Sequence, residues 1–206
     1  MTAETIEIEP VPFAYPQCGP LLRKKDVANC IAAAGVPLDL ARGRAQTYAR
    51  KGLIFTRERG ENGWDSRLYE FHDAATAIVL SALHDAGISD SDVTARAAEA
   101  CYAWNPDAAS RDAKYKRDGG HLPPHPITRA VVGTAFGGES WIFNLDVWRC
   151  AQTEERLICA DLLRWGDEYQ PFPNPPEGFL PMCAVSMTLD HLLAPVARLL
   201  RPEGLH

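Results

Sequence analysis

The sequence predicts a mainly α-helical chain with an α+β part, arranged as an N-terminal helical domain followed by a small α+β domain. Three observations predict this organisation. Apolar residues recur at helical spacing from about residue 25 to 104, a polar and proline-rich stretch fills 105–126, and short apolar runs resume after it. With 206 residues, 46% of them hydrophobic, the chain is long enough to bury its own core.

These observations divide the chain into four parts. Residues 1–22 form an N-terminal arm that four prolines keep extended, and residues 23–104 form the helical domain. Residues 105–126 are a linker. Residues 127–206 form the α+β domain, to which we assign assembly or sensing.

Two helices open the helical domain. The spacing of apolar residues predicts the first over 25–34, and Gly35 ends it. Asp39 is placed to cap a second helix that continues to Lys51 and stops at Gly52. Its inward face is expected to consist of Ala41, Ala45 and Tyr48. Its polar side chains are then expected to point largely toward solvent: Arg42, Arg44, Gln46, Thr47, Arg50 and Lys51.

A β-hairpin follows the second helix. Its strands are expected at about 53–57 and 67–71, around a turn rich in Gly and Asn. Asp73 is placed to cap a third helix over 74–86, and a fourth runs from about residue 90 to 104. The order of helix, turn, basic helix and hairpin predicts a winged helix-turn-helix.

The second half is expected to mix strands and helices. Apolar runs at 128–136 and 139–148 flank Gly137-Gly138 and predict a hairpin. Thr153 is placed to cap a helix that reaches about Trp165. The chain then closes with a strand at 182–189 and a helix at 191–200, which Pro195 limits or kinks.

Charge is segregated along the chain. Residues 23–71 hold ten Lys and Arg against six acids, although the whole chain has a net charge of −6. One basic region therefore stands out against an acidic remainder. Such a distribution indicates a face that seeks an anion while the rest of the surface stays soluble.

At the level of motifs, this region resembles the DNA-binding module of the MerR family, which is a winged helix-turn-helix. The resemblance is carried by Tyr48–Ile54, by the hairpin with Arg57, by Ser66–Tyr69 and by Leu83–Ser89. It covers roughly residues 25–95. The family resemblance implies a dimeric transcription regulator whose second helix enters the major groove. It further implies that Gln46, Thr47 and Arg50 face the groove and that Arg67 contacts a phosphate.

The residues point to DNA on physical grounds as well. Lys and Arg neutralise phosphates and release counterions, while Arg and Gln can form paired hydrogen bonds with base edges. The candidate DNA-binding residues are Lys24, Lys25, Arg42, Arg44, Gln46, Thr47, Arg50, Lys51, Arg57, Arg59 and Arg67.

The expected partners are double-stranded DNA, a second copy of the chain, and an unidentified small-molecule or protein effector. The fourth helix is shorter than the dimerisation helix of typical MerR regulators, so assembly is assigned to 127–206. Two other interpretations stay open. One is a phage-type accessory of DNA packaging or recombination with the same module, and the other is an adaptor whose basic face binds an acidic protein.

Other chemistry has weaker support. We expect no catalytic residues, no metal and no cofactor, because the sequence holds no nucleophile motif, phosphate loop or HExxH helix. His121 and His125 are separated by prolines, and Cys150 and Cys159 lack a third thiol nearby. The acidic N-terminus and the lack of a long apolar run indicate a cytoplasmic protein with no membrane partner and with reduced cysteines.

Tryptophans concentrate in the second half of the chain, and they allow two interpretations. They are Trp104, Trp141, Trp148 and Trp165. One interpretation is core packing, and the other is a pocket for an aromatic ligand.

Overall fold

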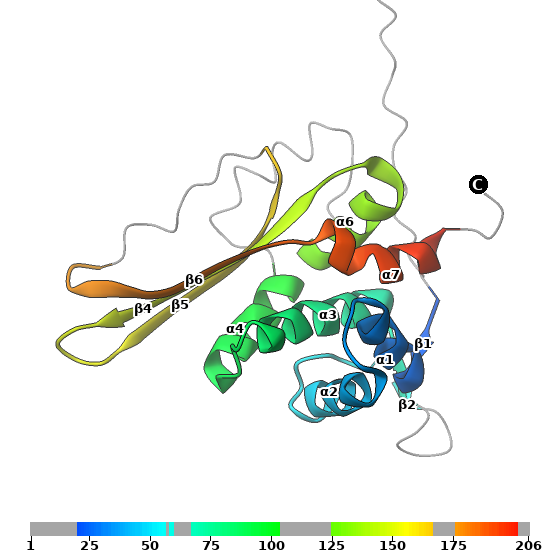
Figure 1. Cartoon of the computed structure of the whole chain (residues 1–206), viewed down its shortest axis with the longest axis horizontal. Coiled ribbons are helices and arrows are strands. Elements are labelled where there is room, and N and C mark those ends of the chain that lie inside the picture. The colour runs from blue at the N-terminus through cyan, green and yellow to red at the C-terminus, as the bar shows by residue number, and fades with distance from the viewer. Residues whose placement is uncertain (1–19, 57, 60–66, 104–124, 167–175, 202–206) are drawn as a thin grey trace, which may run out of the picture.

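The computed structural model describes residues 20–56, 58–59, 67–103, 125–166 and 176–201, which form an α+β structure (Figure 1). In this part of the chain, six α-helices accompany two three-stranded antiparallel sheets. Figure 1 shows the larger sheet extending to one side of a helical body.

The first two helices form as the apolar spacing predicts. Strand β1 (Leu22–Arg23) leads into α1 (Lys24–Ala33), and α2 (Leu38–Arg50) follows. Gly35 has a φ of 110°, which a residue with a side chain rarely adopts, and this conformation turns the chain between the helices. The expected cap at Asp39 is wrong. The N-cap position is occupied by Pro37, whose carbonyl accepts the first hydrogen bond of the helix from the Ala41 N–H.

The expected position of the first hairpin strand is wrong, because β2 (Glu58–Arg59) begins after the expected range of 53–57. The second strand, β3 (Arg67–Tyr69), lies within the expected 67–71 but is shorter, and the small sheet has the order β1-β3-β2. Leu53 and Ile54 are not part of a strand. The Leu53 N–H donates to the carbonyl of Tyr48 at the end of α2, and both side chains are buried in the core. Arg57 lies outside the described residues.

Two further helices complete this half. They are α3 (Phe71–Asp85) and α4 (Ser91–Tyr102). Helix α3 begins three residues before the expected 74, so Asp73 lies inside its first turn and not at the cap. The carboxylate still serves the helix start, since it accepts the Glu70 N–H at 2.9 Å. Helix α4 begins close to the expected residue 90, and Asp90 caps it by accepting the N–H groups of Asp92 and Val93.

In the second half, two elements differ from those that the sequence predicts. Its elements are α6 (Pro126–Val132), the π-helix η3 (Gly133–Gly137), β4 (Trp141–Cys150), β5 (Arg156–Arg164), β6 (Phe179–Thr188) and α7 (Asp190–Leu200). The run at 128–136 is helical and not a strand, and the segment from Thr153 to Trp165 is a strand and not a helix. A short apolar run is compatible with a helix or a strand. Residues 156–164 form a strand because they pair with β4 along their whole length. The expected last strand and last helix are confirmed, and α7 continues through Pro195.

The two halves share one hydrophobic core. Helix α3 is buried on nearly all sides, and Figure 1 shows it between α1 and α2 on one side and α6 and α7 on the other. The same buried cluster holds Ile31 and Tyr48 from the first half and Trp141 and Leu193 from the second. The described parts on either side of 105–126 therefore do not pack as separate units.

Candidate nucleic-acid interface

Helix α2 has one buried face and one exposed face. Ala41, Ala45 and Tyr48 are buried in the core. Arg42, Gln46 and Arg50 are exposed at intervals of four residues and therefore form one row along the helix, which we call the α2 row. Lys51 is exposed just beyond the end of the helix, whereas Thr47 beside the row is half-buried. Figure 1 shows α2 at the edge of the helical body, on the far side from α6 and α7.

The α2 row is open to an approaching partner. The Arg42 guanidinium contacts Asp39 at 3.1 Å, but both side chains are exposed, at 63% and 96%. Such a pair contributes little to stability in water and is readily exchanged for another anion. Gly43 next to the row is exposed, and the space where a side chain would lie is open. A ligand backbone can therefore approach α2 closely there.

Arg44 does not belong to this surface, and the expectation that it points to solvent is wrong. Its side chain is only 12% exposed, and it donates to Asp85 Oδ1 at 2.5 Å and to the Ser81 carbonyl at 3.1 Å. The hydrogen bond from Arg44 lowers the pKa of Asp85. Position 44 adjoins the buried face, so its long side chain reaches α3 and ties the two helices together.

The start of α1 adds two lysines. Lys25 is exposed and Lys24 is half-buried in the first turn. Arg23 pairs with Leu68 in the small sheet, which places this turn beside the base of the hairpin and Arg67. The sheet therefore brings together cations that lie more than forty residues apart in the sequence.

The hairpin carries paired cations of its own. Arg59 of β2 lies directly opposite Arg67 of β3 in the antiparallel register. Arg67 is half-buried. Arg57 and the side chain of Arg59 lie outside the described residues.

Asp73, which the sequence predicts only as a helix cap, is a buried carboxylate that connects three segments of the helical half. Asp73 is 2% exposed and accepts hydrogen bonds from the Phe55 N–H at 3.0 Å and the Tyr102 hydroxyl at 2.6 Å, besides the Glu70 N–H. It thereby joins the segment after α2 to the start of α3 and the end of α4. Burial, together with the nearby Asp73, raises the pKa of Tyr102. No sequence signal linked these residues, since Phe55 and Tyr102 are far apart along the chain.

No family model, curated protein or solved structure matches this chain. The resemblance to the MerR module therefore rests on the residues of the chain itself. Within the described residues no helix is both long and apolar enough to span a membrane, and no group of His, Cys, Asp or Glu is arranged to hold a metal ion.

Proposed function

We propose that this protein binds double-stranded DNA through α2 and the β2–β3 hairpin, and that it acts as a sequence-specific transcription regulator in the form of a homodimer. The observation that carries the proposal is the α2 row: Arg42, Gln46 and Arg50 are exposed along one side of a helix whose other side is anchored in the core.

The dimensions of α2 suit the major groove. A helix of 13 residues is about 20 Å long, and the groove admits a helix with its side chains. Arg and Gln are the residue types that read guanine and adenine edges with paired hydrogen bonds. The α2 row therefore supplies the base contacts in this proposal.

The surrounding cations supply the phosphate contacts. Lys25, Lys51 and Arg67 lie at the start of α1, the end of α2 and the hairpin. In a winged helix-turn-helix, positions beside the recognition helix grip the backbone and set the orientation of the protein on the duplex. The acidic remainder of the chain keeps the other faces away from the duplex.

One observation favours a second candidate, an adaptor that binds an acidic protein. Leu38 and Leu40 at the start of α2 are 40% and 48% exposed, and Phe55 beyond its end is 56% exposed. Exposed apolar side chains beside cations are typical of protein interfaces. The two candidates make different predictions: replacing residues of the α2 row weakens duplex binding if the protein is a DNA-binding regulator, and does not if it is an adaptor.

The test is selection of bound sequences from a random duplex library, followed by affinity measurements on the selected site. Arg42→Ala and Arg50→Ala should each weaken specific binding by about 1–3 kcal/mol where the side chain reads a base. Arg149→Ala is the matched control, since Arg149 is an exposed cation on β4. A palindromic selected site together with a dimer in light scattering would support the homodimer. If no sequence is enriched, or if both α2 variants bind like the control, the proposal is wrong.

A further inference from the structure

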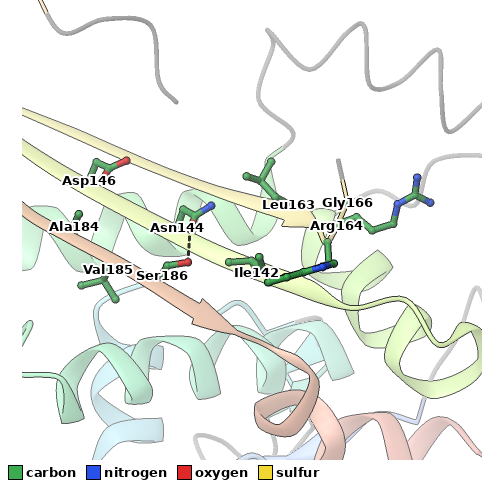
Figure 2. Close-up of a pocket in the computed structure, with 10 residues that line it drawn as sticks. Ile142, Asn144, Asp146, Leu163, Arg164, Gly166, Ala184, Val185 and Ser186 are labelled. Carbon is green, nitrogen blue, oxygen red and sulfur yellow. Dashed lines mark hydrogen bonds between the residues drawn. The ribbon is translucent and has the colours of Figure 1, made fainter. Parts of the chain in front are cut away.

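A cavity lies on the outer face of the larger sheet, away from the proposed DNA surface. Its volume is about 340 Å³, and Figure 2 shows side chains of β4 and β6 and the end of β5 around it. Trp141, Phe143 and Leu145 of β4 are buried in the core. Because side chains alternate along a strand, Ile142, Asn144 and Asp146 point to the other face, where they line the cavity.

Asn144 is the central polar group of this cavity. It is only 9% exposed, and its Oδ1 accepts a hydrogen bond from the Ser186 hydroxyl at 2.7 Å. That bond fixes the orientation of the amide, and Figure 2 shows the amide nitrogen on the side away from Ser186. Within the described part of the chain, this nitrogen has no hydrogen-bond partner. This nitrogen is not among the fully buried polar atoms without a partner, so it is accessible from the cavity, and a ligand acceptor placed here can take the place of solvent.

The remaining lining combines acceptors with apolar surface. The Ser186 hydroxyl has used its proton on Asn144 and presents lone pairs, and the Asp146 carboxylate has several acceptor positions. Ile142 and Leu163 form apolar walls, and Trp165 at the rim is 65% exposed. The cavity therefore needs a ligand that both donates and accepts hydrogen bonds and that also carries an apolar face.

Charge narrows the class of ligand further. Asp146 disfavours an anion, and the Arg164 guanidinium, which also belongs to the lining, lies 3.4 Å from the carboxylate of Glu139. Hydroxyl groups meet the polar requirement because each is at once a donor and an acceptor. A saturated ring bearing several hydroxyls also has a C–H face that packs on an indole. The size of the cavity is at the lower end of small-molecule sites.

From this arrangement we propose that the cavity binds a neutral polyhydroxylated ring of the monosaccharide class. Asn144 donates to one ring oxygen, Ser186 and Asp146 accept from neighbouring hydroxyls, and Trp165 covers the C–H face. The site goes beyond the proposed DNA binding and does not depend on it, because none of its lining residues belongs to α1, α2 or the small hairpin.

The experiment uses the full chain and four named probes: D-glucose, D-galactose, D-mannose and myo-inositol. Ligand-observed NMR and calorimetry should detect millimolar binding of at least one of them. Asn144→Asp keeps the acceptor for Ser186 but removes the donor, and it should weaken that binding about tenfold, the equivalent of one hydrogen bond. Trp165→Ala removes an exposed ring and should weaken binding without loss of fold. Met182→Ala, an exposed change at the other end of β6, is the control and should bind as the wild type does.

Each other outcome overturns the proposal. Absence of binding by all four probes excludes the ligand class. Binding that neither Asn144→Asp nor Trp165→Ala weakens places the probe elsewhere on the molecule. Nicotinamide serves as a counter-probe, and if it binds in an Asn144-dependent way while the four polyols do not, the site takes planar amides instead. If Asn144→Asp fails to fold, Trp165→Ala alone decides, because its side chain lies outside the core.

Discussion

At the residue scale, Asp73 and Arg44 each connect elements that lie far apart in the sequence. Asp73 accepts three hydrogen bonds from three separate segments while nearly fully buried. Arg44 joins α2 to α3 through Asp85 and Ser81. Arg44 anchors α2 itself, and Asp73 anchors the segment that follows α2, and neither belongs to the exposed α2 row. Their loss is therefore expected to reduce stability first and duplex binding only as a consequence.

Asp73→Ala should be strongly destabilising. It leaves the Tyr102 hydroxyl and the Phe55 N–H without their partner in a partly buried setting, at a cost of up to about 1–3 kcal/mol for each group. Urea denaturation followed by circular dichroism measures the free energy of unfolding. Asp39→Ala at the exposed start of α2 is the control and should change it by less than about 0.5 kcal/mol. Equal stability of the two variants would contradict the bracing role.

Stability should depend on the charge of Asp85 in acid. The hydrogen bond from Arg44 holds the folded-state pKa of Asp85 below its ordinary value of 3.8. The ionised carboxylate therefore stabilises the fold above that value, and the contribution is lost as the pH falls through the lowered pKa. The stability gap between the wild type and Asp85→Asn should be largest near neutral pH and should shrink in acid. In an Arg44→Ala background the gap should be small at every pH, and a gap that persists there would show that another group holds the carboxylate.

At the element scale, strand pairing decided several assignments. Residues 156–164 hold Leu, Ile and Ala in a run that fits a helix or a strand, and the segment became β5 because it pairs with β4 along nine residues. In the small hairpin, pairing sets Arg59 of β2 opposite Arg67 of β3 in the antiparallel register. The hairpin is thus expected to bind phosphate and not to read bases.

Arg67→Ala should lower affinity for selected and random duplexes alike. Loss of one phosphate contact should reduce the slope of log affinity against log salt by about one unit. Fluorescence anisotropy at several salt concentrations measures that slope, with Arg149→Ala on β4 as the exposed control. A loss confined to the selected sequence would mean that the hairpin reads bases.

At the scale of the whole molecule, the shared core couples the two halves. Leu193 of α7 is fully buried in the same cluster as Tyr48 of α2, although the proposed DNA surface and α7 lie on opposite sides of α3 (Figure 1). We therefore expect a destabilising change in α7 to affect α2 through α3. Cooperative unfolding of both halves follows from a core that has no internal boundary.

Leu193→Ala should destabilise the entire chain by about 2–5 kcal/mol, the usual cost of a cavity in a packed core. Denaturation followed in parallel by tryptophan fluorescence and by duplex binding should show a single midpoint. Leu199→Ala, at a 40% exposed position of the same helix, is the matched control.

A second test is truncation. A fragment that ends near residue 105 lacks α6 and α7 and should not fold stably. Two separate midpoints, or a stably folded fragment, would show that the halves are independent.

The sequence by itself determined the local features of this protein. Helices α1 to α4 follow from apolar spacing and from glycines at their ends, although the predicted capping acids Asp39 and Asp73 lie inside their helices. The basic character of the region from 23 to 71 follows from counting charges. Exposure of Arg42, Gln46 and Arg50 could be predicted because Ala41, Ala45 and Tyr48 mark the opposite face of the helix. These properties depend on neighbours within one or two turns, so they are written in a short stretch of sequence.

Only the tertiary structure decided what depends on distant partners. Position 44 turned inward because Asp85 and Ser81 were within reach, residues 156–164 became a strand because β4 was beside them, and Asn144 met Ser186 across a sheet. The two halves became one body because α3 offers apolar surface on both sides. Each of these outcomes depends on groups far apart in the chain that folding brings into contact, and such contacts are not encoded in any local pattern.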